Sequence, residues 1–474
     1  MRLLATVPAH TMKSSAVHFW PGDVLYGRLR PYLNKVYRPE FEGLCSAEFI
    51  VFPHTYLHPR YLQYLLNSSA FVSFASHLNT GDRPRVDYEQ LGPYPVNLAP
   101  LCEQYRIADE IEKQLTRLDA AVAALERARA NLKRYRASVL QAACEGRLVP
   151  IEAELARAEG RDYEPADQLL ERILKERRAK WEADQLANMQ AKGKAPRDDG
   201  WKAKYQEPAA PETDGLPELP EGWMWANLDA VLSRIQAGKS FRCEERAPSQ
   251  DEVGVVKVSG VTWGRYNEIE SKTCPDLKRY DPTLLIQQGD FLFSRANTIE
   301  LVGACVIAEQ VSLRVMLSDK ILRFSIPAVF EWWVLLALRS PFGRDEIQRL
   351  STGNQESMRN IGQDRIRRIR IPIPPAAEID RIVEEWKWRD SIIDQLETAV
   401  EHSLKRSERL RQSVLKRAFE GQLVPQDPSD EPAGVLLERI RAERSSAAQA
   451  QHSRRKGPGQ RGHRVRQGTD AIRP

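Results

Sequence analysis

The sequence predicts a mixed α/β protein, in which two α/β globules are separated by two long helices that form an antiparallel coiled coil. The first observation is an internal repeat: RYRASVLQAACEGRLVP (134–150) and RLRQSVLKRAFEGQLVP (409–425) are identical at eleven of seventeen positions. The second is a row of residues, mostly apolar, at seven-residue intervals that leads into each of these segments. The third is a pair of similar strand-like segments, PGDVLYGR (21–28) and QGDFLFSR (288–295). A whole domain and a long helix are therefore repeated, and we expect pseudo-twofold symmetry.

The two heptad rows predict spacer helices at 100–147 and 376–422. In the first helix the row is Ile111, Leu118, Leu125, Leu132 and Val139, with Ala121, Ala128 and Tyr135 three residues after its members. In the second helix the row is Trp386, Ile393, Val400, Ser407 and Val414, with Leu396, Ser403 and Leu410. Positions a and d of a heptad form the seam of a coiled coil, so we expect these two rows to face the partner helix. The alternative is that each helix packs on a separate core.

Both helices are expected to end at a Glu-Gly pair followed by Leu-Val-Pro, at 145–150 and 420–425. Glycine adopts the left-handed conformation that closes a helix, and proline shortly afterwards prevents its continuation. Each helix also begins after a proline-containing stretch, which favours extended backbone. These breaks serve as domain boundaries.

The boundaries divide the chain into six segments. Only 21 residues lead to the Gly-Asp turn of the first globule, whereas 73 lead to that of the second. The first globule is therefore expected to be N-terminally shortened, either because the true start lies upstream or because the protein is truncated. The segments are the first globule at 1–99, the first spacer helix at 100–147, a helical segment and linker at 148–215, the second globule at 216–375, the second spacer helix at 376–422, and a C-terminal segment with a disordered basic tail at 423–474.

Composition predicts a cytoplasmic protein. The chain has six scattered cysteines without a C-x-x-C pair, no run of eighteen apolar residues, and no signal-peptide pattern. The formal net charge of +5 comes from the tail after Ser445, and the rest of the chain is close to neutral. DNA contacts must then come from local basic patches.

No catalytic or metal motif emerges from the sequence. The GKS triplet at 238–240 lacks the glycine that a phosphate-binding loop requires at position 233, where Ser233 stands. Glu385 and Lys387 have nuclease-like spacing but lie within a heptad helix, and His54 and His58 have no further ligands nearby. We therefore expect no catalytic, cofactor-binding or metal-binding residues in this chain.

Several loops combine arginine or lysine with amides and hydroxyls, the side chains that contact phosphates and base edges. Arginine fits the guanine edge with two hydrogen bonds, and asparagine or glutamine fits adenine. Thr80-Gly81 and Thr352-Gly353 occupy equivalent places in the two copies, which favours a binding role over ordinary polar loops. The candidate DNA-binding residues are Arg28, Arg30, Arg83, Arg85, Lys239, Arg242, Arg265, Arg295, Asn297, Asn354, Gln355 and Arg359.

The order of these motifs resembles that of the specificity subunit of type I restriction–modification systems. The resemblance covers about residues 20–444. It is carried by LPELPEGWMWANLDAV, GDVLYGRLRPYLNKV, GDFLFSRANTIELVGACVIAEQ, TGNQESMRNIGQDRIRRIRIPIPPAAEIDRIV and the two helix ends.

The resemblance implies a non-catalytic subunit in which two target-recognition domains each read half of a bipartite double-stranded DNA site. The paired helices would set the distance between half-sites, roughly 70 Å for 47 residues, or about two turns of B-DNA. They would also dock methyltransferase subunits, with restriction subunits completing the complex. S-adenosylmethionine, ATP and magnesium would belong to those partners. Trp386, Trp388 and Phe419 are expected to face a partner.

Two other functions stay open on the sequence alone. One is a coiled-coil scaffold that joins two protein-binding globules without sequence-specific DNA binding. The other is an enzyme, a nuclease or methyltransferase in its own right. The sequence does not show which bases are recognised, how long the spacer between half-sites is, or whether the shortened globule is functional.

Overall fold

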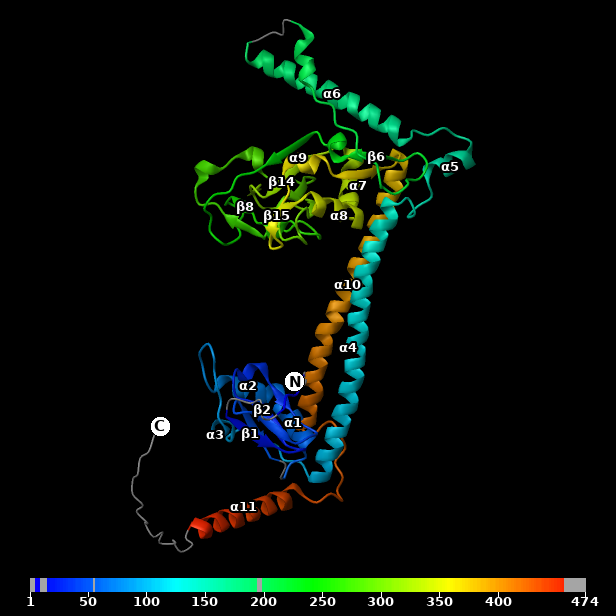
Figure 1. Ribbon diagram of the computed structural model, residues 1–474. Coiled ribbons are helices and arrows are strands. Elements are labelled where there is room, and N and C mark those ends of the chain that lie inside the picture. Colours follow the sequence, from blue (N-terminus) through cyan, green and yellow to red (C-terminus); the bar gives the residue numbers. More distant parts are fainter. Residues whose placement is uncertain (1–4, 9–14, 54–55, 194–197, 456–474) are drawn as a thin grey trace, which may run out of the picture. The chain divides into compact units, whose positions relative to one another are not determined.

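The computed structural model describes residues 5–8, 15–53, 56–193 and 198–455. The chain divides into two compact units, and each contains one globule and part of both long helices (Figure 1). The first unit comprises residues 1–127 and 399–474, and the second comprises residues 128–398. The long helices are α4 (Leu101–Cys144) and α10 (Ala376–Phe419).

The globule of the first unit has a small antiparallel sheet of order β3-β2-β5 and a separate β1-β4 ribbon. Helices α1 and α2 cover the β3-β2-β5 sheet, and Tyr26 and Phe71 make an edge-to-face contact in the core between them. The elements are β1 (Ala16–Phe19), β2 (Val24–Gly27), β3 (Val36–Tyr37), β4 (Gly43–Ser46), β5 (Phe49–Phe52), α1 (Pro59–Leu66), α2 (Ser69–His77) and α3 (Tyr88–Leu91).

The globule of the second unit repeats this plan and extends it. Its main sheet has the order β12-β10-β14-β7, and three smaller sheets have the orders β11-β16-β15, β13-β8-β9 and β17-β6. Its elements are α5 (Glu152–Glu159), α6 (Ala166–Ala191), β6 (Met224–Asn227), β7 (Arg234–Ala237), β8 (Gly254–Val256), β9 (Ser271–Thr273), β10 (Phe291–Ser294), β11 (Ala296–Asn297), β12 (Cys305–Ile307), β13 (Val315–Met316), β14 (Ile321–Ser325), α7 (Ala328–Arg339), α8 (Pro341–Leu350), β15 (Thr352–Gln355), β16 (Met358–Asn360), α9 (Gln363–Arg367) and β17 (Arg370–Ile373).

The two globules share one order of elements, as the internal repeat predicts. In each, the strand after the Gly-Asp turn (β2 or β10) is the central strand of an antiparallel trio, β3-β2-β5 or β12-β10-β14. Two helices follow, and serine N-caps the second in both: Ser68 accepts from Phe71 N–H at 3.3 Å and Ser340 from Gly343 N–H at 3.1 Å. The predicted mixed α/β fold with two globules and two long helices is confirmed.

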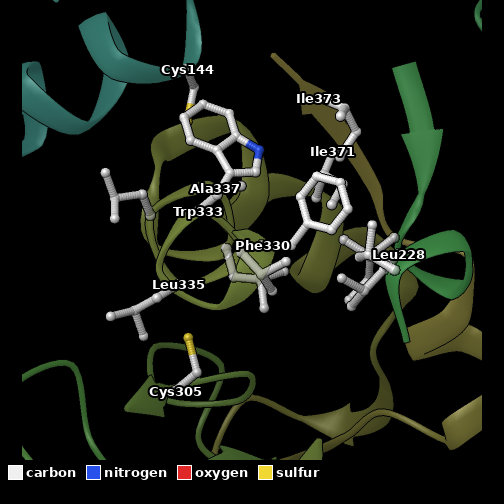
Figure 2. Close-up of a cluster of buried hydrophobic side chains, with 14 of the residues drawn as sticks. Cys144, Leu228, Cys305, Phe330, Trp333, Leu335, Ala337, Ile371 and Ile373 are labelled. Atoms are coloured by element: carbon white, nitrogen blue, oxygen red, sulfur yellow. The ribbon is translucent and has the colours of Figure 1, made fainter. Parts of the chain in front are cut away.

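The core of the second globule surrounds Trp333 of α7, which is fully buried (Figure 2). Its indole Nε1–H donates to Pro372 O at 2.7 Å, and its ring meets Trp223 edge to face at 5.6 Å. The same cluster takes in Cys144 at the end of α4 and Ile371 of β17. The globule and the end of the long helix in this unit are therefore one packed body.

The two long helices pair antiparallel. In the first unit the start of α4 meets the end of α10, with Ile107 and Ile111 packed against Leu415. In the second unit the end of α4 meets the start of α10, where Arg136 binds Asp390. Within each unit, the two helix segments lie side by side (Figure 1).

The second row of the predicted seam is only partly correct. The first row of each helix, from Ile111 and from Trp386, is buried or half-buried as expected. Four of the six members of the second row face solvent: Tyr135 is 45% exposed, Leu396 47% and Leu410 46%, and Ala121 is exposed as well. Ala128 and Ser403 are half-buried, as expected. Residues four places after the first row, such as Val122, are half-buried in their stead. Residues three and four positions after a given residue both lie next to it on the helix surface. The direction from which the partner helix approaches decides which of the two is covered.

A charged cluster joins the helices in the second unit. Arg136 of α4 donates to Asp394 at 2.8 Å and to Glu397 at 3.0 Å, and it also binds Asp390. Burial raises the pKa of Asp390, and Arg136 opposes that shift. One guanidinium therefore binds three carboxylates on successive turns of α10.

Replacing Arg136 with methionine is expected to lower the unfolding free energy by about 1–3 kcal/mol. The apolar stem is kept, but three partly buried carboxylates lose their shared cation, and the cost stays below that of a fully buried pair because the site is partly exposed. Chemical denaturation measures the loss. Lys133→Met, at an exposed position of the same helix, is the matched control, and an equal effect of both variants would contradict this role.

Both long helices end as predicted. Gly146 and Gly421 have φ values of 66° and 71°. In each case the following residue closes a six-residue turn, with Arg147 N–H donating to Ala142 O and Gln422 N–H to Arg417 O, both at 2.8 Å. This is the Schellman arrangement, in which glycine avoids the strain that a side chain would meet.

Each helix start is anchored by the chain that follows the other helix. In the second unit Arg381 binds Glu152 at 2.6 Å, and Glu378 accepts from Trp223 Nε1–H and from Glu152 N–H, both at 3.0 Å. In the first unit Arg106, the counterpart of Arg381, binds Asp430 at 2.6 Å. The repeat thus produces two similar junctions, each built from both copies.

Two further expectations require correction. Trp386 is only 5% exposed and packs on Trp332, so it does not face outward, whereas Phe419 is half-buried against Tyr61 and Trp388 is 60% exposed. The expected disordered tail is helical in part, since α11 runs over Ala433–Arg455, and residues 456–474 lie outside the described residues.

Candidate nucleic-acid interface

Four loops of the second globule meet at one end of its main sheet. We call them the second loop cluster: residues 238–240, 295–297, 318–320 and 352–360. Gly238 N–H donates to Ser318 O at 3.2 Å, and Arg295 N–H donates to Lys320 O at 2.9 Å. Strand β11 pairs with β16, with Asn297 opposite Arg359. The structure therefore brings together three of the loops that the sequence singled out.

The hairpin of β15 and β16 carries several exposed polar residues of this cluster. Gly353 has a φ of 132°, and a Cβ there would collide with Met358 O. The pairing is irregular between Thr352 and Gln355. Gln355 is exposed, and its side chain makes no hydrogen bond with the described residues. Asn354 lies in β15, but its side chain is outside the described part of the chain.

Two arginines of the cluster are held by the globule itself. Arg295 donates from Nε to Asp319 O at 2.7 Å, and its Nη1 lies 3.5 Å from Asn360 Oδ1. Arg359 donates to Gly353 O at 2.7 Å and to Ser351 O and Oγ at 3.2 Å. Two donors of Arg295 and three of Arg359 are already used within the globule, so these contacts favour a role in shaping the loops over a role in reading bases. Asn297 caps its own turn, where Oδ1 accepts from Thr298 N–H at 2.9 Å.

The remaining candidates of the second globule differ in whether their side chains already have partners. Lys239 is exposed and lies 4.0 Å from Asp281, and exposed Arg242 has no hydrogen bond or ion pair among the described residues. Both suit contact with phosphate. Arg265 lies apart from the cluster, because it pairs at 3.2 Å with Asp394 of α10.

The first globule holds a corresponding set of loops, which we call the first loop cluster: residues 28–34, 46–48 and 79–87. Leu29 bridges Arg85, and Arg30, with a φ of 55°, donates its N–H to Pro84 O at 2.8 Å. Arg28 pairs with Asp87 and Arg85 with Glu48. Arg83 is exposed and has no hydrogen bond or ion pair within the described residues.

The backbone frameworks of the two clusters correspond. Val86 N–H donates to Arg28 O at 3.1 Å, as Ile361 N–H does to Arg295 O at 2.9 Å. Gly81 and Gly353 have similar φ values of 120° and 132°. The framework is therefore shared, whereas the residues that follow the glycine differ, with Asp82-Arg83 in one cluster and Asn354-Gln355 in the other.

The correspondence also identifies a pair of residues that the sequence did not single out. Arg28 N–H donates to Glu48 O at 2.8 Å, and Arg295 N–H donates to Lys320 O at 2.9 Å. Glu48 and Lys320 therefore occupy equivalent places with opposite charge. Neither stands in a recognisable motif, and only the pairing of strands reveals that they border the clusters.

The described residues contain no group of three or more His, Cys, Asp or Glu side chains placed to hold a metal ion. Within the same residues, no helix is both long and apolar enough to cross a membrane.

Comparisons with known proteins point to one family, although no protein-family model matches the chain. The chain is 26% identical over 466 residues to the type I restriction enzyme EcoEI specificity subunit of Escherichia coli, across 85% of this chain and 74% of that protein. It is 23% identical over 435 residues to the type I restriction enzyme EcoKI specificity subunit of Escherichia coli K12, across 88% of this chain and 77% of that protein. A solved structure from work on complex assembly and conformational transition of the type I R-M system matches the fold with a TM-score of 0.58 and 17% identity, covering 87% of this chain and 85% of that one.

Proposed function

We propose that this chain, a member of the family of type I restriction enzyme specificity subunits, recognises the DNA sequence for a restriction–modification complex. Each globule reads one half of a bipartite site in double-stranded DNA. The observation that supports this best is the shared framework of the two loop clusters, which carry different residues after the same glycine. A common scaffold that presents unlike side chains suits two unlike half-sites.

The residues divide into two roles under this proposal. Gln355 and Asn354 read base edges, since amide side chains match adenine in the major groove. Lys239, Arg242 and Arg83 contact phosphates, which contributes affinity without sequence preference. Arg28, Arg295 and Arg359 shape the loops from within, and Arg30 and Arg85 belong to the first cluster through backbone and ion-pair contacts.

Catalysis belongs to partner subunits. The paired helices α4 and α10 set the distance between the half-sites and dock methyltransferase subunits, and restriction subunits complete the complex. S-adenosylmethionine, ATP and magnesium then bind those partners and not this chain. Exposed Trp388 of α10 suits a place in such a docking surface, because large exposed aromatic side chains are enriched at interfaces.

Binding to duplex DNA tests the proposal directly. The chain, co-purified with its methyltransferase partner, is expected to retain one set of duplexes against a large excess of competitor DNA. Selection from a random duplex library identifies that set. If competitor DNA abolishes the binding of every duplex, the result would instead support a scaffold that joins two protein-binding globules.

Replacing Asn354 and Gln355 together with alanine is expected to relax the bases of one half-site only. Losing a good base contact costs about 1–3 kcal/mol of discrimination, whereas losing a phosphate contact weakens all sequences alike. Mapping methylated sites in a genome measures the change. The Arg242→Ala variant is the comparison, because it should reduce methylation at all sites without altering the motif.

An unchanged motif in the double alanine variant would contradict the base-reading role. A uniform loss of methylation would assign the hairpin to positioning instead.

A further inference from the structure

Two cysteines of the second globule lie directly opposite each other across an antiparallel bridge. Glu244 and Thr273 exchange both backbone hydrogen bonds, at 2.9 Å and 3.1 Å. The next pair outward in such a ladder is a non-hydrogen-bonded pair, with Cα atoms about 4.5 Å apart and side chains on the same face. That pair is Cys243 and Cys274, and the ladder stops there because the next residue, Pro275, has no N–H.

The surroundings keep the two thiols together. Cys274 is 5% exposed, and Cys243 is half-buried against the same small cluster, which includes Val253 and Met316. Burial raises the pKa of the Cys243 thiol, and the neighbouring Cys274 thiol raises it further. Both cysteines are free thiols in this structure. A disulfide needs Cα atoms about 4.4–6.8 Å apart, so this pair can close with little backbone movement.

We propose that Cys243 and Cys274 are a redox modification site that forms a reversible disulfide with small-molecule disulfides as the oxidant. The Cys243 thiolate attacks one sulfur of the external disulfide, forms a mixed disulfide and expels one thiolate. The Cys274 thiolate then attacks Cys243 Sγ, forms the internal S–S bond and expels the second thiolate. The two protein thiols lose two electrons and two protons, and the external disulfide is reduced to two thiols.

The bond would tie the loop after β7 to β9. Residues 238–240 of that loop belong to the second loop cluster, and Arg242 directly precedes Cys243. The cross-link would therefore restrict a phosphate contact, a consequence that rests on the proposed function. The cross-link itself does not depend on it.

The test uses the purified full-length chain without DNA, treated with oxidised glutathione and then with an alkylating reagent. Tryptic digestion without reductant should yield peptide 243–246 linked to peptide 273–278, two hydrogen atoms lighter than the sum of the free peptides. The thiolate is the attacking form, and the raised pKa of Cys243 keeps this thiol mostly protonated at neutral pH. The reaction should therefore speed up as pH rises. Oxidation should also raise the thermal unfolding midpoint by several degrees, and dithiothreitol should reverse this rise.

Exposed Cys102 provides the internal control, because it should carry a glutathione adduct in the same sample. Cys243→Ser and Cys274→Ser should each abolish the linked peptide, and Cys102→Ser should leave it unchanged. Separate glutathione adducts on Cys243 and Cys274, or two unmodified thiols beside a modified Cys102, would overturn the proposal. The result is independent of whether the chain binds DNA.

Discussion

A Trp333→Ala variant is expected to lose about 3–5 kcal/mol of unfolding free energy, the usual cost of removing a buried tryptophan. Trp333 is fully buried, and Figure 2 shows its ring beside Cys144 of α4 and the β17 residues Ile371 and Ile373. The variant would leave a large cavity and would also deprive Pro372 O of its 2.7 Å hydrogen bond from the indole. Because this core includes the end of α4, the loss should reach the helix junction of this unit as well as the globule.

Chemical denaturation followed by circular dichroism measures this effect. Trp388→Ala is the matched control, since the same side chain is removed from a position that is 60% exposed. Trp333→Phe separates packing from hydrogen bonding, because it keeps most of the apolar volume but removes the N–H donor. Equal midpoints for Trp333→Ala and Trp388→Ala would show that the second globule is not organised around this residue.

Replacing Glu346 with glutamine is expected to cost about 2–3 kcal/mol at neutral pH. Glu346 of α8 accepts from Arg349 at 3.0 Å and from Arg370 of β17 at 2.5–2.9 Å. Burial works to raise the pKa of Glu346, but the hydrogen bonds from the two arginines outweigh it and lower the pKa to about 2. A depression from the ordinary 4.5 to about 2 corresponds to roughly 3 kcal/mol, reduced somewhat because Arg349 is half exposed.

The pH dependence gives this prediction a specific signature. A carboxylate whose pKa is lowered on folding stabilises the protein above its unfolded pKa, and the contribution is lost as pH falls toward the folded value. The difference between wild type and Glu346→Gln should therefore be full above about pH 5 and should shrink between about pH 4.5 and pH 2. Glu384→Gln, at an exposed position of α10, should show neither effect. A difference that stays constant down to pH 2 would contradict the ionic role.

Features that depend on local sequence were predictable. Gly146 and Gly421 end their helices because glycine tolerates left-handed backbone, and that requirement is visible in the Glu-Gly-x-Leu-Val-Pro pattern itself. The repeat of the two globules was predictable for a similar reason, since Gly-Asp turns and strand patterns recur in the same order. The first row of each helix seam also follows from its seven-residue spacing.

Features that depend on long-range contacts were not predictable. The a/d assignment failed at Tyr135, Leu396 and Leu410, because the side from which the partner helix approaches is not encoded in the spacing of one helix. Trp386 looked like an interface residue, but its partner Trp332 lies 54 positions earlier in the chain. The roles of Arg295 and Arg359 likewise depend on carbonyl groups of neighbouring loops, and a list of polar residues cannot show which donors are already used.

Under the proposed function, this chain reads two half-sites for a methyltransferase partner. The most direct measurement is genome-wide mapping of N6-methyladenine in cells that express this chain with that partner, compared with cells from which only this chain is deleted. We expect a split motif, in which two defined blocks flank a spacer of constant length and adenine is methylated in both blocks. This methylation should vanish in the deletion. A continuous motif, or methylation that persists without this chain, would refute the proposed function.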